Sequence, residues 1–185
     1  AFLAACYGFT EDEVKMLAER HNASMDNLKM WYDGYNIGRE KSIYNPYSVM
    51  KALQRGSCRS YWTTTGAYDS VITYIQMNFD GLKDDIIRML AGERVYVNTS
   101  KFQNDMNIVR SKNDVLTVLI HLGYLAYDDE KQQCYVPNKE VTDELLNAVE
   151  DTSWKRLADA ITASRNLLDA TIAGNENAVA QAIDL

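Results

Sequence analysis

Apolar residues recur with helical spacing along most of this chain, and the most apolar run follows Ser111. Ser111 and Asp114 stand three positions apart, as in a capping box that begins a helix. The residues after them leave almost no polar face, so the sequence predicts a helix that is buried on most sides. Gly123 then suits the left-handed end of that helix. The apolar positions are Val115, Leu116, Val118, Leu119, Ile120 and Leu122.

Two short strands and another helix are predicted directly after this run. Residues 124–127 and 134–136 are β-prone, and the polar residues 128–133 between them suit a turn. Pro137 ends the second strand and Asn138 can cap a helix, whose inner face is marked by Val141, Leu145 and Val149. The order helix, strand, wing, strand is typical of the latter half of a winged-helix module.

The rest of the chain gives mostly helical signals. Helices are expected after Thr10, which forms a capping box with Glu13, and after Ser24 and Asn45. A small hairpin is expected from residues 35–37 and 42–44. The fold class predicted is therefore mainly α with a small β component. The remaining expected elements are helices at 71–79, 82–90, 153–173 and from 178, a strand near Val95 and Val97, and a loop with one short helix at 99–110.

Composition narrows the class of protein. The chain has 185 residues and a formal net charge of −7, from 26 acidic against 19 basic residues. This balance weakens a nucleic-acid interpretation, because phosphate contacts need clustered Lys and Arg. No apolar run approaches the roughly 18 residues that span a bilayer. The three cysteines, Cys6, Cys58 and Cys134, are widely spaced and predict buried free thiols in a reducing compartment.

No catalytic or metal-binding constellation is visible in the sequence. There is no GxxxxGK[ST] phosphate loop and no GxGxxG segment. His21 and His121 are the only histidines, and neither stands near a Cys or carboxylate at metal-ligand spacing. Since His121 lies in the apolar run, we expect a satisfied core histidine there. We therefore predict no catalytic residue, no cofactor and no metal in this chain.

Aromatic residues are densest in the first third of the chain. We expect them to lie close together and to pack in a core or between domains, because large aromatic side chains bury much area. The alternative is a docking surface for a ligand or a protein, with one edge exposed. The block consists of Trp31, Tyr32, Tyr35, Tyr44, Tyr47, Tyr61 and Trp62.

Five short segments occur in an order that resembles a known family. They are WYDGYNI (31–37), YNPYSV (44–49), YWTTTG (61–66), HLGYLAYD (121–128) and VPNKEV (136–141). Together they resemble the bacterial AAA-ATPase-like proteins that carry a PD-(D/E)XK nuclease-type domain at the C-terminus. The chain resembles the region between the ATPase core and the nuclease-like domain, and it begins as if cut from inside a longer protein. The family's phosphate-loop and nuclease residues have no counterparts here.

The resemblance implies an architecture and a function. It implies a helical lid-like part at 1–80, a winged-helix-like part at 81–150 and connecting helices at 151–185. The expected function is a non-catalytic regulatory or interaction region in the cytoplasm. Its expected partners are the parent's ATPase core and nuclease-like domain, or a second copy bound through exposed apolar surface. The alternative is a nucleic-acid-binding winged helix that uses Arg110, Lys112 and Asn113.

Overall fold

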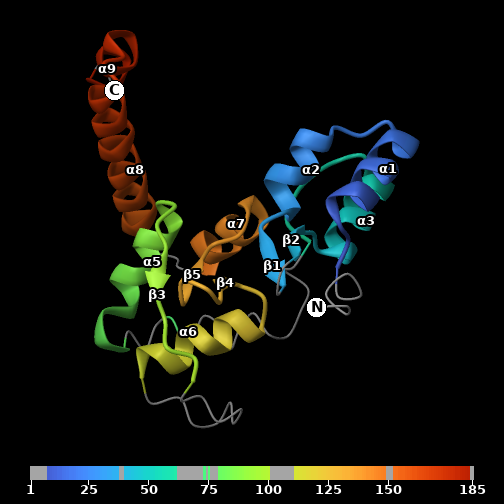
Figure 1. Cartoon of the computed structure of the whole chain (residues 1–185), viewed down its shortest axis with the longest axis horizontal. Helices are drawn as coiled ribbons and strands as arrows, with labels where there is room; N and C mark the ends of the chain where they lie inside the picture. Colours follow the sequence, from blue (N-terminus) through green and yellow to red (C-terminus); the bar gives the residue numbers. More distant parts are fainter. Residues whose placement is uncertain are drawn as a thin grey trace.

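The computed structural model is mainly helical and contains two small antiparallel sheets, as the sequence predicted. It describes residues 8–37, 40–61, 73, 75, 79–100, 111–148 and 152–183. Figure 1 shows a helical group with a hairpin at the N-terminal side, a central group with the second sheet, and a long helical extension. We call these the N-lobe (8–61), the winged lobe (79–148) and the arm (152–183). None of the helices described is long and apolar enough to cross a membrane.

The N-lobe begins its helices where the sequence provides capping side chains. Thr10 and Glu13 form the predicted capping box, and Ser24 and Asn45 accept hydrogen bonds from backbone N–H groups of the next two helices. β1 and β2 pair as a hairpin, as predicted, but β2 begins at Glu40, within the predicted loop, and ends at Ile43, while Tyr44 bridges to Phe9. The elements are α1 (Glu11–His21), α2 (Met25–Tyr32), β1 (Tyr35–Ile37), β2 (Glu40–Ile43) and α3 (Pro46–Arg55).

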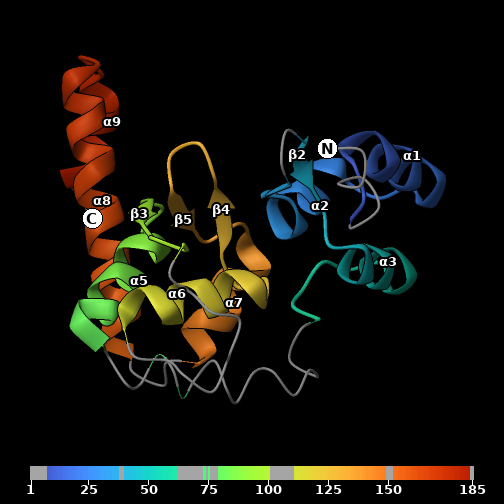
Figure 2. The ribbon, with the colours of Figure 1, turned by 60° about the horizontal axis from the view of Figure 1, so that its bottom comes forward.

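The winged lobe has the predicted order of helix, strand, turn, strand and helix. A short 3-10 turn, η2 (Phe79–Gly81), precedes α5. The strands pair antiparallel in the order β3, β5, β4, which places the last strand of the chain in the middle of the sheet. Figure 2 shows this sheet beside α5 and α6. The elements are α5 (Leu82–Leu90), β3 (Val95–Tyr96), α6 (Lys112–His121), β4 (Ala126–Asp128), β5 (Gln133–Tyr135) and α7 (Lys139–Ala148).

The first predicted wing strand begins later than the sequence suggested. The N–H groups of Tyr124 and Leu125 both donate to the carbonyl oxygen of Leu119, at 2.9 Å and 3.2 Å, so these two residues close the end of α6. The strand proper begins at Ala126. The helix expected at 71–79 and the loop expected at 99–110 lie largely outside the described residues.

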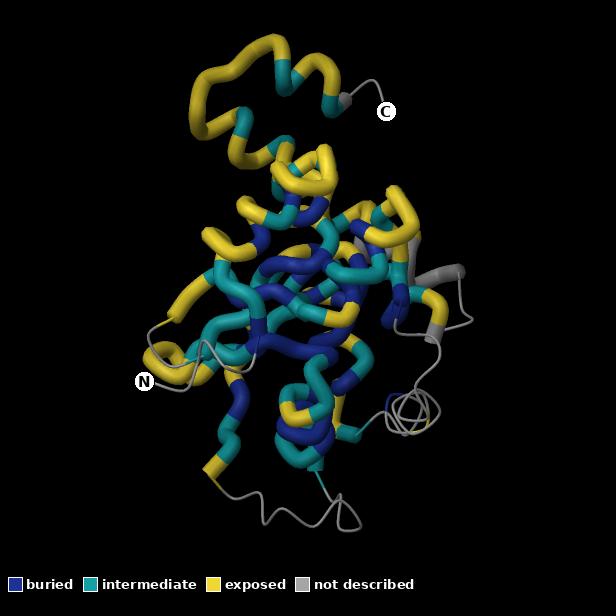
Figure 3. Tube along the Cα trace, turned by 90° about the vertical axis from the view of Figure 1, so that its right-hand side faces the viewer, coloured by how far each residue is buried: buried dark blue, intermediate teal, exposed yellow. Residues whose placement is uncertain are grey.

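The arm consists of α8 (Thr152–Ile172) and α9 (Glu176–Ile183), joined at Gly174 in the left-handed conformation. Ile161 packs against the winged lobe, and Arg165 donates to the carbonyl oxygen of Ala91 at 3.0 Å and pairs with Glu93 at 2.8 Å. Beyond this anchor the arm projects from the winged lobe and is largely exposed (Figure 3).

Each lobe has its own hydrophobic core. The winged lobe buries mainly aliphatic side chains, among them Leu116, Leu119 and Leu145. The N-lobe core instead contains three tyrosines, Tyr32, Tyr44 and Tyr61, beside small and aliphatic residues. Because the two cores are separate clusters, the lobes are held together by contacts other than those within either core.

Candidate functional site at the joint between the lobes

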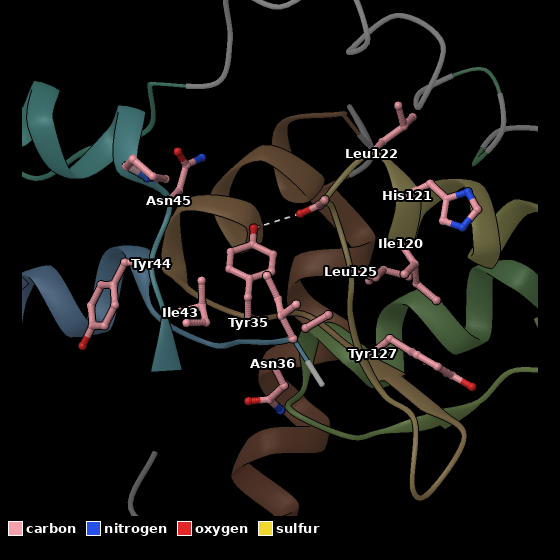
Figure 4. A pocket seen from close by; sticks show the side chains of 14 residues that line it. Tyr35, Asn36, Ile43, Tyr44, Asn45, Ile120, His121, Leu122, Leu125 and Tyr127 are labelled. Carbon is pink, nitrogen blue, oxygen red and sulfur yellow. Dashed lines mark hydrogen bonds between the residues drawn. The ribbon is translucent and has the colours of Figure 1, made fainter. Parts of the chain in front are cut away.

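The surface where the N-lobe meets the winged lobe is built from polar groups, and we call it the joint. The Tyr35 hydroxyl donates to the carbonyl oxygen of Gly123 at 2.8 Å (Figure 4). In the other direction, the Tyr135 hydroxyl donates to the carbonyl oxygen of Gly34 at 3.0 Å and accepts from Asn36 Nδ2 at 2.8 Å. Each lobe therefore supplies a tyrosine that bonds the backbone of the other.

The two backbones approach closely at Gly34. This residue has φ of +111°, a conformation that L side chains rarely adopt. A Cβ atom placed there would overlap the carbonyl group of Pro137 in the winged lobe. Gly34 therefore allows both the positive φ and the close approach to Pro137, and both depend on the absence of a side chain.

Asn138 combines the predicted helix cap with a contact across the joint. Its Oδ1 accepts from the N–H of Val141 at 3.1 Å, which caps α7. Its Nδ2 donates to the carbonyl oxygen of Asp33 at 2.8 Å. The side chain is buried, so its two bonds fix the start of α7 against the end of α2.

Glu140 lies at the centre of the joint and is 1% exposed. Its Oε1 accepts from the Ser48 hydroxyl at 2.9 Å and from the Tyr61 N–H at 2.8 Å. Burial raises the pKa of Glu140 from its ordinary 4.5 to about 7; the bonds from Tyr61 and Ser48 oppose this rise and the neighbouring Glu144 adds to it. Glu140 therefore joins α7 to two separate N-lobe segments through one oxygen atom.

Glu144 lies one helical turn further along α7 and is fully buried. Its Oε1 accepts a hydrogen bond from the Ser60 hydroxyl. Its Oε2 has no hydrogen-bond partner in the part of the chain that the structure describes. The joint thus buries two carboxyl groups on one face of α7, which is unusual because burying a carboxylate is costly.

The segment that carries Ser60 and Tyr61 is held in place by Tyr32. The Tyr32 hydroxyl donates to the carbonyl oxygen of Arg59 and accepts from the Arg59 N–H, both at 3.0 Å. Burial raises the Tyr32 pKa well above its ordinary value. At the rim, Lys139 Nζ lies 4.8 Å from the centre of the Trp31 ring, a cation–π contact between α7 and α2.

The aromatic block predicted from the sequence is therefore divided among three environments. Tyr32, Tyr44 and Tyr61 are buried in the N-lobe core, and Trp31 packs against that core. Tyr35 lies in the joint. Tyr47 is 52% exposed and Trp62 lies outside the described residues. The three buried tyrosines are core side chains and offer no surface to a partner.

Two of the three residues predicted to contact nucleic acid, Lys112 and Asn113, have partners within the chain. Lys112 Nζ lies 2.7 Å from the Asp85 carboxylate, and Asn113 Oδ1 accepts from the N–H of Asn98 at 3.1 Å. Arg110 is outside the described residues. These bonds hold the start of α6 against α5 and the segment after β3.

The prediction that His121 is a core histidine was wrong. It is the last residue of α6 and its side chain is exposed. The apolar run suggested burial. The helix, however, turns this position away from the core, to which α6 contributes Val115, Leu116 and Leu119. His121 lines a groove of about 420 Å³ between the lobes, together with Tyr35, Ile43 and Leu125 (Figure 4).

Within the described residues, no group of three or more His, Cys, Asp or Glu side chains could hold a metal ion. Cys58 and Cys134 are both free thiols. Burial raises the pKa of the Cys134 thiol to about 12, so this group stays protonated at neutral pH. Cys6 lies outside the described residues.

Comparisons with known proteins assign no family to this chain. Over 65 residues the chain is 34% identical to an uncharacterized protein in the vnfD 5′ region of Azotobacter chroococcum mcd 1. The match covers 34% of this chain and 12% of that protein. No family model matches the sequence, and no solved structure matches it.

Sequence reasoning did not identify the two buried glutamates or the requirement for Gly34. A signal was present in the sequence. Each glutamate directly precedes an apolar residue, Val141 or Leu145, and the two glutamates lie four positions apart on one helix face. The partners of these glutamates could not be read from the sequence, since Ser48 and Tyr61 are 92 and 79 positions away from Glu140.

Proposed function

We propose that this chain is a non-catalytic regulatory and interaction region of an AAA-ATPase-like protein. In this proposal, the joint holds a helical lid-like part and a winged-helix-like part in one orientation. The two parts then present a common surface to a nucleotide-binding core that lies outside this chain. The nuclease-like domain of the parent is the second partner.

The observation that carries this proposal is the convergence of the five resembling segments on the joint. WYDGYNI supplies Tyr35, YNPYSV supplies Ser48 and YWTTTG supplies Tyr61. HLGYLAYD supplies the carbonyl group of Gly123, and VPNKEV supplies Glu140. Segments dispersed along the sequence thus share one physical role, which is to fix the two lobes together. That role is structural, which supports a region that transmits position rather than one that performs chemistry.

Two experiments test the proposal. Isothermal titration of the chain with Mg-ATP should show no binding, because no segment with the features of a phosphate loop is present in its sequence. Micromolar binding would contradict the non-catalytic assignment. The coding sequence that flanks this chain tests the association: a phosphate loop upstream and nuclease-type carboxylates downstream are expected, and unrelated flanking domains would overturn it.

A nucleic-acid-binding winged helix is the second candidate, and the strand order β3, β5, β4 beside α6 favours it. The local charges oppose it, because Lys112 is paired with Asp85, β4 ends in Asp128, and the turn after it carries Asp129 and Glu130. Fluorescence anisotropy with a short DNA duplex should show no salt-dependent binding. Binding that weakens steeply with salt would favour this candidate over the first.

A further inference from the structure

We propose that the joint is a proton-linked clamp, in which closure of the lobes takes up a proton on Glu140 and deprotonation loosens their contact. This inference deepens the proposed function, because it assigns a form of regulation to the same joint. It concerns only the residues of this chain, however, and its test does not depend on the identity of the ATPase core.

The geometry of the two buried carboxyl groups is the basis of this proposal. Glu140 and Glu144 face the N-lobe from the same side of α7, and both are at most 1% exposed. Their donors are neutral groups: the hydroxyls of Ser48 and Ser60 and the N–H of Tyr61. Across the described residues, no Lys or Arg forms an ion pair with either glutamate. For Glu140, burial without a cation favours the neutral carboxyl group over the carboxylate.

The other charged and titratable groups around Glu140 do not supply that cation. On the solvent side of α7, Lys139 pairs with Asp143 at 3.0 Å. Arg55 and Arg59 lie 5.6 Å and 5.4 Å from the centre of the Tyr61 ring, over its faces. The remaining groups facing the joint are Tyr32 and Asp33 from the end of α2, Tyr35 from β1, Cys58 and Tyr61 after α3, and Tyr124 and Glu144 from the winged lobe.

The sign of the effect follows from the two states of Glu140. In the closed joint burial holds its pKa at about 7, whereas in an open joint the side chain meets water and returns to the ordinary 4.5. Between these two values the closed form binds a proton that the open form has lost. Closure is therefore most favourable at low pH, becomes less favourable as pH rises through this window, and changes no further above it.

The test follows the titration and the joint in the same sample. Carbon-13 NMR of the whole chain should give a midpoint near pH 7 for the Glu140 side-chain carboxyl. From pH 4.5 to pH 7, hydrogen exchange at the Tyr61 and Val141 amides, corrected for intrinsic rates, should lose protection as pH rises. Amides of Leu116 and Leu119, in the hydrophobic core of the winged lobe, should keep their protection. A midpoint near 4.5, or joint amides that stay equally protected from pH 4.5 to pH 7, overturns the proposal.

Three variants separate a clamp from simple burial. Glu140→Gln should remove the pH dependence of joint protection, whereas Asp143→Asn, on the same helix but facing solvent, should leave it unchanged. Ser48→Ala removes a donor to the ionised form, so it should move the midpoint upward, and this readout remains decisive if Glu140→Gln does not fold. An unmoved midpoint in Ser48→Ala counts against the clamp. These results leave the association with an ATPase core to be judged by the flanking sequence.

Discussion

The core of the winged lobe and the joint beside it are both buried, but the core consists of apolar side chains and the joint of polar groups. The core packs aliphatic side chains such as Leu116, Leu119 and Leu145, which need only shape complementarity. The joint instead buries hydrogen-bonding groups such as Glu140 and Asn138, which need specific partners at specific distances. The core is therefore expected to set the stability of its lobe. The joint is expected to set the orientation of one lobe relative to the other. Its net contribution to the free energy of unfolding should be smaller than that of the core.

The largest expected effect is in the core. Leu119→Ala should lower the free energy of unfolding by roughly 2–5 kcal/mol, because Leu119 is fully buried in the last turn of α6 and its truncation leaves a cavity. Urea denaturation followed by circular dichroism measures this loss. Leu168→Ala is the matched control, because Leu168 is 57% exposed on the arm and its truncation should change stability by less than about 0.5 kcal/mol. A loss below about 1 kcal/mol for Leu119→Ala would mean that α6 is not buried as described.

The next effect should be confined to the joint. Gly34→Ala forces a Cβ atom into the Pro137 carbonyl group at a positive φ, and we expect a loss of roughly 1–3 kcal/mol. Gly56→Ala is the control, since Gly56 also has a positive φ but has no atom within 4 Å of the added Cβ, so the loss should be roughly 1 kcal/mol. Hydrogen exchange should show faster exchange at joint amides in the first variant only. Equal losses in the two variants would argue against a close approach at Gly34.

Asn138→Ala tests whether a helix cap can also act as a contact between lobes. It removes the cap of α7 and the bond to Asp33, and caps are worth roughly 0.5–2 kcal/mol. Asn175→Ala removes a comparable cap from α9 on the exposed arm. Both variants should lose cap energy, but only Asn138→Ala should loosen the α2 amides in hydrogen exchange. Loosening in both, or in neither, would contradict a role for Asn138 across the joint.

The smallest expected effect is at the start of α6. Lys112→Ala should lower stability by up to roughly 1 kcal/mol, because Lys112 is 31% exposed and Arg88 still lies 3.7 Å from the buried Asp85 carboxylate when Lys112 is removed. Lys15→Ala provides a comparison for the loss of a lysine that is exposed on a helix. Thermal unfolding at low and high salt measures the difference. A loss clearly above about 1 kcal/mol that persists in high salt would show that Arg88 does not compensate the buried Asp85 carboxylate.

Local features of the fold were predictable and long-range ones were not. The capping boxes at Thr10 and Ser111 and the hairpin after α2 follow from residues within a few positions of one another, and the structure has them all. His121 was misassigned because an apolar run does not reveal which face its last residue occupies. The partners of Glu140 could not be predicted, since no local signal links α7 to Ser48 or Tyr61.

The joint also has a consequence for the order in which the chain folds. Its bonds connect residues 79 to 105 positions apart, from Tyr61 with Glu140 to Asp33 with Asn138. Contacts of such sequence separation form late, because the intervening chain must first be ordered. During synthesis the N-lobe emerges before α7 exists, so Ser48 and the Tyr61 N–H remain bonded to water until the winged lobe is complete. Docking of the lobes is therefore expected as a slow final phase of refolding, separate from the formation of the two cores.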